Sequence, residues 1–222
     1  MDSIVVGNGN QGNAIERFLT AFDKVLALNE SDPASRVAFD CEGVNLCHRE
    51  GVDHAQHIRC FQALMTLFES PHVVKVIHDC CIDCDALHHL HGIALVNVHE
   101  TSCHHAVSTE QEISNLNAVL ECHGSPSNAM RGRTIHRRNL SYWASRPLTK
   151  KMITWASSDV NKLLCLAEMQ LSTLSDSEVK LGCPKSQECS TMVCDMQLQH
   201  HVPCRGNMGD KLNSRFTAME SG

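Results

Sequence analysis

The sequence predicts an α/β fold built as one domain. Helical apolar periodicities alternate with short apolar or β-branched runs along residues 13–171, and this alternation is typical of α/β proteins. The chain has 222 residues, of which 42% are hydrophobic, so it is long enough to bury a sizeable core. A chain of this length fits one domain with room for a tail.

The expected elements follow from local patterns in chain order. Strands are predicted where short apolar or β-branched runs occur, at residues 37–40, 73–77 and 94–99. Amphipathic helices are predicted where apolar positions recur at helical spacing, at residues 13–28, 59–69, 83–91, 112–122 and 149–171. Gly92 and Gly124 each follow a predicted helix, a position that glycine commonly takes at helix C-termini.

The character of the chain changes after Leu174. Periodic apolar residues become few, and glycine, proline, serine and cysteine are scattered. We therefore expect a flexible N-terminus over residues 1–12, a folded domain over 13–174, and a cysteine-rich, disordered tail over 175–222.

Composition argues against several classes of protein. Lys and Arg total 19 against 25 Asp and Glu, which argues against a wholly basic nucleic-acid coat protein but allows a local basic patch. No apolar run approaches the roughly 18 residues of a membrane span. The N-terminus lacks the basic and apolar regions of a secretory signal, so we expect a cytoplasmic or nuclear protein, not secreted, whose 13 cysteines are mostly reduced thiols.

Carboxylates mark three segments. Asp40 and Glu42 end the first predicted strand two residues apart, so their side chains can share one face. Asp83 follows the second strand, and Asp159 lies four residues after Trp155 in the last predicted helix. Taken singly, such acids are usually solvated surface groups, but a cluster of four favours hard cations such as Mg²⁺ or Mn²⁺.

These segments resemble the DEDD superfamily of 3′-5′ exonucleases, and most closely its ribonuclease D-like, Egalitarian-like branch. The resemblance rests on VAFDCEGV from residue 37, VVKVIHDCCIDCDAL from residue 73, and RPLT from residue 146 with MI and WASSDV after it. It covers residues 13–171. It implies a ribonuclease H-like mixed sheet flanked by helices.

The resemblance also implies a site and a reaction. Asp40, Glu42, Asp83 and Asp159 would hold two Mg²⁺ or Mn²⁺ ions and hydrolyse terminal phosphodiester bonds of RNA or single-stranded DNA, releasing a nucleoside monophosphate. Asp83 matches the family spacing from His78, while Asp85 is the rival in register.

The sequence departs from the family pattern in three places. Trp155 stands where tyrosine-type members place a tyrosine, and Thr154 where histidine-type members place a histidine; an indole N–H can only donate a hydrogen bond. Only residues 44–58 lie where the family runs two further strands, so we expect a shortened sheet edge. The sequence Glu100-Thr101-Ser102 replaces a usual Asp-Thr start, a change that we expect to affect helix capping.

A basic stretch precedes the last predicted helix. Between residues 131 and 151 no Asp or Glu interrupts the basic residues Arg131, Arg133, Arg137, Arg138, Arg146, Lys150 and Lys151. From these we expect Arg133, Arg137, Arg138, Arg146, Lys150 and Lys151 to bind nucleic-acid phosphates. A solvated charged loop is the alternative.

Two further hypotheses accompany the exonuclease. The first is a catalytically impaired exonuclease fold that binds nucleic acid or protein partners, which Trp155 and the short region after Glu42 favour. The second is a zinc-stabilised interaction protein organised by the tail, although its Cys and His spacings match no common zinc template.

Overall fold

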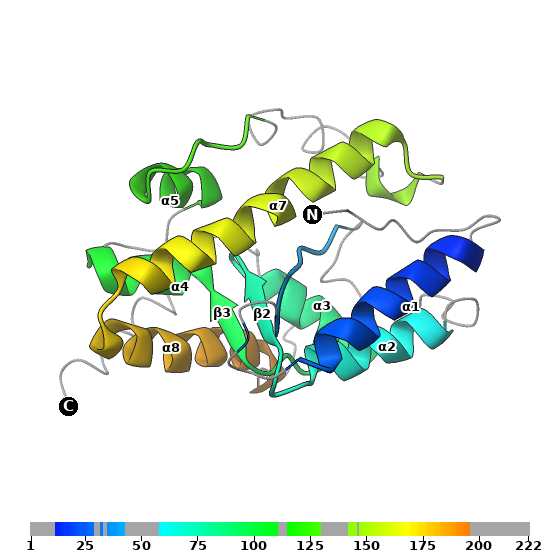
Figure 1. The fold of residues 1–222 in the computed structure, drawn as a ribbon, viewed down its shortest axis with the longest axis horizontal. Helices are drawn as coiled ribbons and strands as arrows, with labels where there is room; N and C mark the ends of the chain where they lie inside the picture. Colours follow the sequence, from blue (N-terminus) through cyan, green and yellow to red (C-terminus); the bar gives the residue numbers. More distant parts are fainter. Residues whose placement is uncertain are drawn as a thin grey trace.

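The computed structural model describes residues 12–28, 32, 35–42, 58–110, 115–129, 142–145 and 147–195. Its elements, shown in Figure 1, are in chain order α1 (Gly12–Leu26), β1 (Arg36–Ala38), α2 (Ile58–Phe68), β2 (Val74–Ile77), α3 (Cys81–His91), β3 (Val98–Glu100), α4 (Thr101–Thr109), α5 (Leu116–Cys122), the 3₁₀ turn η2 (Tyr142–Ala144), α7 (Lys150–Thr173) and α8 (Asp176–Asp195). The class is α/β, as the sequence predicts.

The described strands form a parallel sheet in the order β1-β2-β3. Val37 lies opposite Lys75, and Val76 lies opposite His99. Because the strands are parallel, their carboxyl ends meet at one edge, where loops can assemble a site. The further strands that the resemblance implies, and the shortened edge, fall on residues 43–57 and lie outside the described residues.

Helices cover both faces of this sheet. On one face Val73 and Ile77 of the β2 segment join a core with Phe22 of α1 and with Leu67 and Phe68 of α2. On the other face Val76 joins a core formed with α5 and α7, whose buried members are Leu116, Val119, Leu120, Leu163, Leu166 and Ala167. The alternation along β2 follows from the two-residue period of a strand.

Most helices with an apolar stripe begin and end close to the residues that their sequence patterns predict. Gly92 takes a left-handed conformation with φ of 69°, and its N–H donates to the carbonyl of His88, which closes α3 as expected of a terminal glycine. Thr149 caps α7 by accepting a hydrogen bond from the N–H of Met152. The strand expected over 94–99 is shorter and later, at Val98–Glu100, and the helix expected from residue 112 begins at Leu116.

Two helices differ from the sequence prediction. Helix α4 follows β3 directly and is not among the helices expected from apolar spacing, because its sequence TSCHHAVST has no apolar period. The prediction of a disordered tail from residue 175 is wrong for the first part of that segment, since Asp176–Asp195 form α8. Helix α8 packs against α3, α4 and β3, and Figure 1 shows it running beside α4.

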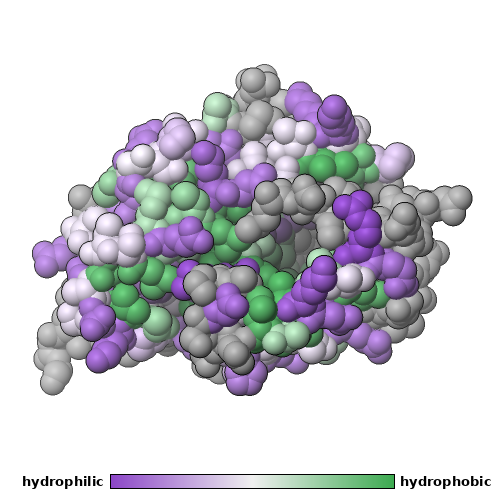
Figure 2. Space-filling model, in the orientation of Figure 1, coloured by the Kyte–Doolittle hydropathy of each residue, from purple (hydrophilic) through white to green (hydrophobic). Residues whose placement is uncertain are grey.

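The surface is mixed in character. Figure 2 shows hydrophobic residues reaching the surface in separate groups among hydrophilic ones. Among the described residues, the large hydrophobic side chain that is well exposed is Leu181 of α8, at 47%. None of the helices in the described part of the chain is long and apolar enough to cross a membrane.

Candidate active site

The carboxyl ends of β1 and β2 bring three of the predicted carboxylates together. Asp40 and Glu42 follow β1, and Asp83 lies in the first turn of α3, just after β2. The backbone N–H of Cys41 donates a hydrogen bond to the Asp83 carboxylate, which joins the two segments directly. Asp83 is buried, while Asp40 and Glu42 are half-buried.

The electrostatics of this group are unfavourable without a cation. Burial raises the pKa of Asp83 well above its usual value, and the negative charge of Asp40 raises it further, with smaller effects from Asp79 and Glu42. The hydrogen bond from Cys41 acts in the opposite direction but does not outweigh burial. A positive charge at this place would relieve the repulsion.

Asp85, the rival in register, has a different neighbour. It is buried on α3, and its Oδ1 lies 3.6 Å from Nε2 of His89, one helical turn later. The effects on the pKa of Asp83 come from Asp40, Asp79 and Glu42, so Asp83 is the α3 carboxylate that faces the β1 acids.

Glu100 supports the turn that leads to Asp83, a role beyond the capping change that the sequence suggests. Its side chain is fully buried and accepts the N–H of Asp79 at 2.6 Å, the N–H of Cys103 at 2.6 Å and the hydroxyl of Ser102 at 2.5 Å. Asp79 has a φ of 60°, which aspartate tolerates better than most residues. Glu100 therefore caps α4 and also fixes the β2–α3 turn.

Asp159 lies on α7, which packs across β1 and β2. It is buried, and the side-chain amide of Asn128 donates to its Oδ1 and, at 2.9 Å, to the hydroxyl of Ser158. Sequence reasoning missed Asn128, because a polar residue in a loop after α5 has no periodic signal. One oxygen of the buried Asp159 carboxylate therefore has a hydrogen-bond donor in the Asn128 amide.

Trp155 belongs to a small apolar cluster. It is 7% exposed and packs with Trp143 of η2 and Met152 of α7, with Tyr142, Leu148 and Ala156 around them. This packing accounts for a large aromatic side chain at this position. It adds no group that could accept a proton.

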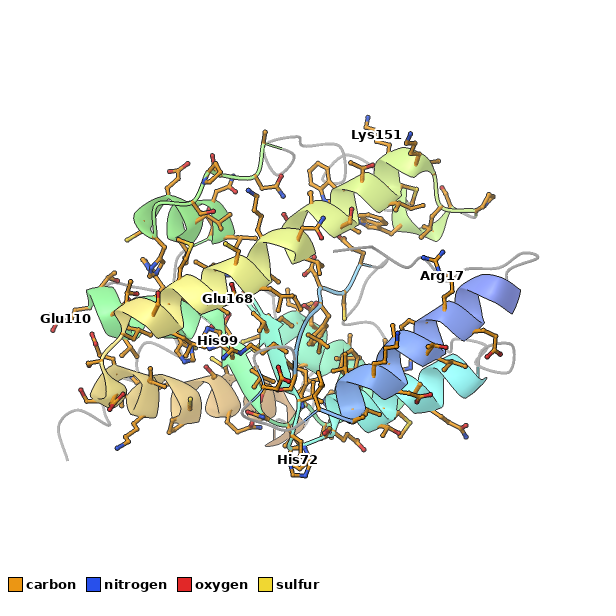
Figure 3. All side chains as sticks on the ribbon, in the orientation of Figure 1. Arg17, His72, His99, Glu110, Lys151 and Glu168 are labelled. Carbon is orange, nitrogen blue, oxygen red and sulfur yellow. The ribbon has the colours of Figure 1, made fainter. Side chains whose placement is uncertain are left out.

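The basic stretch is partly described. Lys150 and Lys151 are exposed in the first turn of α7, and Figure 3 shows Lys151 pointing away from the body of the molecule. Arg131, Arg133, Arg137, Arg138 and Arg146 lie outside the described residues. Their predicted contact with phosphates stays a prediction.

The chemistry of the donor set fits a hard divalent ion. Asp40, Glu42, Asp83 and Asp159 offer carboxylate oxygens alone, the ligands that Mg²⁺ and Mn²⁺ prefer, and Asp83 is destabilised as an anion by its neighbours. Among the residues that the structure describes, however, no three His, Cys, Asp or Glu side chains converge closely enough to hold a metal ion.

Comparison with known proteins agrees with the arrangement of strands and helices. Ribonuclease D of Trypanosoma brucei, solved in complex with GMP, is similar with a TM-score of 0.67 and 13% sequence identity, over 90% of this chain and 69% of that one. No curated protein matches the chain. Residues 30–171, which hold all three carboxylate segments, match the 3′-5′ exonuclease family. On that match, which spans more than half of its length, the chain belongs to the 3′-5′ exonuclease family.

Proposed function

We propose that this chain is a metal-dependent 3′-5′ exonuclease that hydrolyses terminal phosphodiester bonds of RNA or single-stranded DNA in the cytoplasm or nucleus. The observation that supports it best is that Asp40, Glu42 and Asp83 follow the carboxyl ends of β1 and β2, near enough for Asp40 and Glu42 to raise the pKa of Asp83. Substrate-processing sites of open α/β sheets lie at this edge.

The carboxylates have distinct roles in this proposal. Asp40, Glu42 and Asp83 would hold two Mg²⁺ or Mn²⁺ ions, and Asp159 would complete the site from α7. When bound, such ions activate a water molecule and neutralise charge on the phosphate. Glu100 and Asn128 are positioning residues, because they hold the Asp79 turn and the Asp159 carboxylate.

The product expected is a nucleoside monophosphate released from the 3′ end. The Trypanosoma brucei ribonuclease D was solved with GMP, which belongs to that class of compound. Lys150 and Lys151 would contact phosphates of the bound strand, because they are exposed at the start of the helix that holds Asp159.

A second candidate is a nucleic-acid-binding module without turnover. Two observations favour it: Trp155 is packed into an apolar cluster in place of the tyrosine of active relatives, and Asn128 already donates a hydrogen bond to Asp159. Both candidates predict binding of a single strand, and hydrolysis separates them.

The test is the shortening of a 5′-labelled single-stranded RNA by the purified protein with Mn²⁺. The exonuclease predicts a ladder that shortens from the 3′ end and that Asp40→Asn and Asp159→Asn each abolish. Asp23→Asn, on the exposed face of α1, is the matched control and should leave the ladder unchanged. An intact substrate that the folded protein nevertheless binds would favour the second candidate.

Binding has its own signature in salt. If Lys150 and Lys151 each contact one phosphate, replacing both with alanine lowers the slope of log affinity against log salt by about 1.4, since each contact to a single strand contributes about 0.7. Fluorescence anisotropy of labelled RNA at several salt concentrations measures that slope. An unchanged slope would remove these lysines from the interface.

A further inference from the structure

Four buried cysteines lie close together where helices α3 and α4 pack against α8. Cys80 and Cys81 stand at the N-terminus of α3, Cys103 lies in the first turn of α4, and Cys189 lies on α8. All four are buried, with exposures between 1% and 6%. We refer to these four as the thiol cluster. The exonuclease site uses none of them.

Cys189 is the centre of the thiol cluster. Its sulfur lies 3.3 Å from the sulfur of Cys103, and the thiols of Cys80 and Cys81 also hydrogen-bond to it. Hydrogen bonds from these three neighbours lower the pKa of Cys189, while the pKa values of Cys103, Cys80 and Cys81 are raised. Cys103 and Cys189, whose sulfurs lie 3.3 Å apart, are therefore the two thiols of the cluster best placed to form a bond.

The geometry favours a pair over a metal centre. A structural zinc ion needs four ligands arranged around one point. The 3.3 Å approach of two sulfurs is instead a short movement away from a covalent bond.

We propose that Cys103 and Cys189 form a reversible disulfide that fastens α8 to the exonuclease domain under peroxide. In the first step the Cys189 thiolate attacks hydrogen peroxide: an S–O bond forms, the O–O bond breaks, and hydroxide leaves and takes up a proton to give water. In the second step the Cys103 sulfur attacks the sulfenic sulfur: the S–S bond forms, the S–O bond breaks, and the hydroxyl leaves with the Cys103 proton as water. The two sulfurs lose two electrons, and one peroxide becomes two waters.

Access of peroxide to the buried thiols follows from the sequence of α8. Pro184 lies inside the helix and has no N–H to donate to the carbonyl one turn earlier, which weakens α8 ahead of Cys189. Local opening of this helix exposes Cys189, and closing returns it to Cys103. Oxidation would therefore add a covalent bond to the contacts that already hold α8 against α3, α4 and β3.

The fastened helix supports the turn beside the carboxylates. The hydroxyl of Ser186, one helical turn before Cys189, accepts the N–H of Glu100 at 3.2 Å. Glu100 in turn accepts the N–H of Asp79 ahead of Asp83. The disulfide would thus hold in place a chain of contacts that ends at the β2–α3 turn, whether or not the protein hydrolyses RNA.

Peptide mapping of the full-length protein tests the bond directly. The protein is exposed to a small excess of hydrogen peroxide, alkylated under denaturing, non-reducing conditions and digested. We expect one linked pair of peptides containing Cys103 and Cys189, lighter by two hydrogen atoms than the reduced peptides and separated by dithiothreitol. The absence of this pair, or a dominant bond from Cys189 to Cys80, Cys81 or another cysteine, would overturn the proposal.

A thermal measurement gives a second, independent readout. Because the bond closes a loop of 86 residues, we expect the oxidised protein to unfold roughly 5–10 °C above the reduced protein. Cys103→Ser and Cys189→Ser should each abolish the difference. Cys183→Ser, at an exposed position of α8, is the matched control and should preserve it. Stoichiometric zinc that the wild type holds and Cys189→Ser loses would assign the cluster to a metal and contradict the disulfide.

Discussion

At Asp83, burial and the negative charges of Asp40 and Glu42 all destabilise the ionised carboxylate in the folded protein. The pKa of this carboxyl is raised in the folded state, so its contribution to stability is present while it is protonated and is lost as pH rises through the folded-state pKa. A carboxylate kept at such a place for metal binding costs stability when no cation is present.

Replacing Asp83 with asparagine therefore has opposite effects on activity and stability. Asparagine keeps the shape and an oxygen that can accept the Cys41 N–H, but it removes the negative charge. We expect RNA hydrolysis to fall to background and, without divalent ions at about pH 8.5, the melting temperature to rise by about 2–4 °C, as a gain of about 1 kcal/mol gives for a chain of this size. A melting temperature that falls as much as the activity would contradict the electrostatic account.

Trp155 allows a test of the missing proton acceptor. Trp155→Tyr places a hydroxyl where tyrosine-type relatives have one, while Trp155→Phe leaves a similar space beside Trp143 and Met152 without a hydroxyl. If the protein is an enzyme, the tyrosine variant should hydrolyse RNA roughly tenfold faster than the phenylalanine variant. Single-turnover rates of both proteins measure this ratio. Equal rates would show that the tyrosine-type step is not available to this chain.

At the scale of elements, the packing of α8 on α4 depends on a glycine. A Cβ built on Gly182 would lie 2.7 Å from Cδ2 and 2.8 Å from Nε2 of His104, which is fully buried. His104 is also held by the Glu100 carbonyl at 3.1 Å and the Ser186 hydroxyl at 3.3 Å, so its ring has little freedom to move.

Gly182→Ala should consequently loosen α8 even though alanine favours helices. The intrinsic gain of about 1 kcal/mol is opposed by overpacking, which costs about 1–3 kcal/mol. We expect a lower melting temperature and faster proteolysis within α8. Cys183→Ala, the next residue and exposed, should show neither effect. A higher melting temperature for Gly182→Ala would mean that Gly182 of α8 does not pack against the His104 ring.

The sequence predicts best the elements that have an apolar stripe or a β-branched run. Helices α1, α2, α3 and α7 and strands β1 and β2 lie within a few residues of their predicted positions for that reason. Helices α4 and α8 were missed because polar side chains far apart in sequence join them: the Ser186 hydroxyl lies 3.3 Å from Nδ1 of His104, and both side chains are fully buried. Such contacts leave no period in the sequence.

The candidate site divides in a similar way. Asp40, Glu42 and Asp83 could be predicted to share one sheet edge because each follows a short parallel strand, and the structure places Asp40 and Glu42 near enough to raise the pKa of Asp83. Their role as metal ligands stays a prediction. Asn128 and the role of Glu100 could not, since each acts through a partner that is distant in sequence, Asp159 and Asp79 respectively.

At the scale of the whole molecule, buried histidines make stability depend on pH. His99 stacks on His104 with ring centroids 3.8 Å apart, and burial lowers the pKa of His99 to about 3 and also lowers that of His104. A base with a lowered folded-state pKa costs stability as pH falls below the unfolded value of about 6.5. Glu100 acts in the opposite sense, because burial raises its pKa to about 7.

The effect of one histidine is isolated by a difference measurement. Relative to His99→Gln, the wild type should lose about 1.5 kcal/mol of stability between about pH 6.5 and pH 5. Urea unfolding of both proteins across this range gives the difference. A constant difference between wild type and His99→Gln would show that His99 is not held neutral.

The position of α8 at the end of the described chain has a consequence for biosynthesis. Cys103 and His104 leave the ribosome 92 residues before Asp195, a delay of roughly 5–20 s at ordinary rates of translation. During that interval the nascent chain can pair β1, β2 and β3, but the helix that covers Cys103 and His104 does not yet exist. Cys103 and His104 therefore stay uncovered by α8 throughout that interval, and also in any nascent chain that stops before α8 is made.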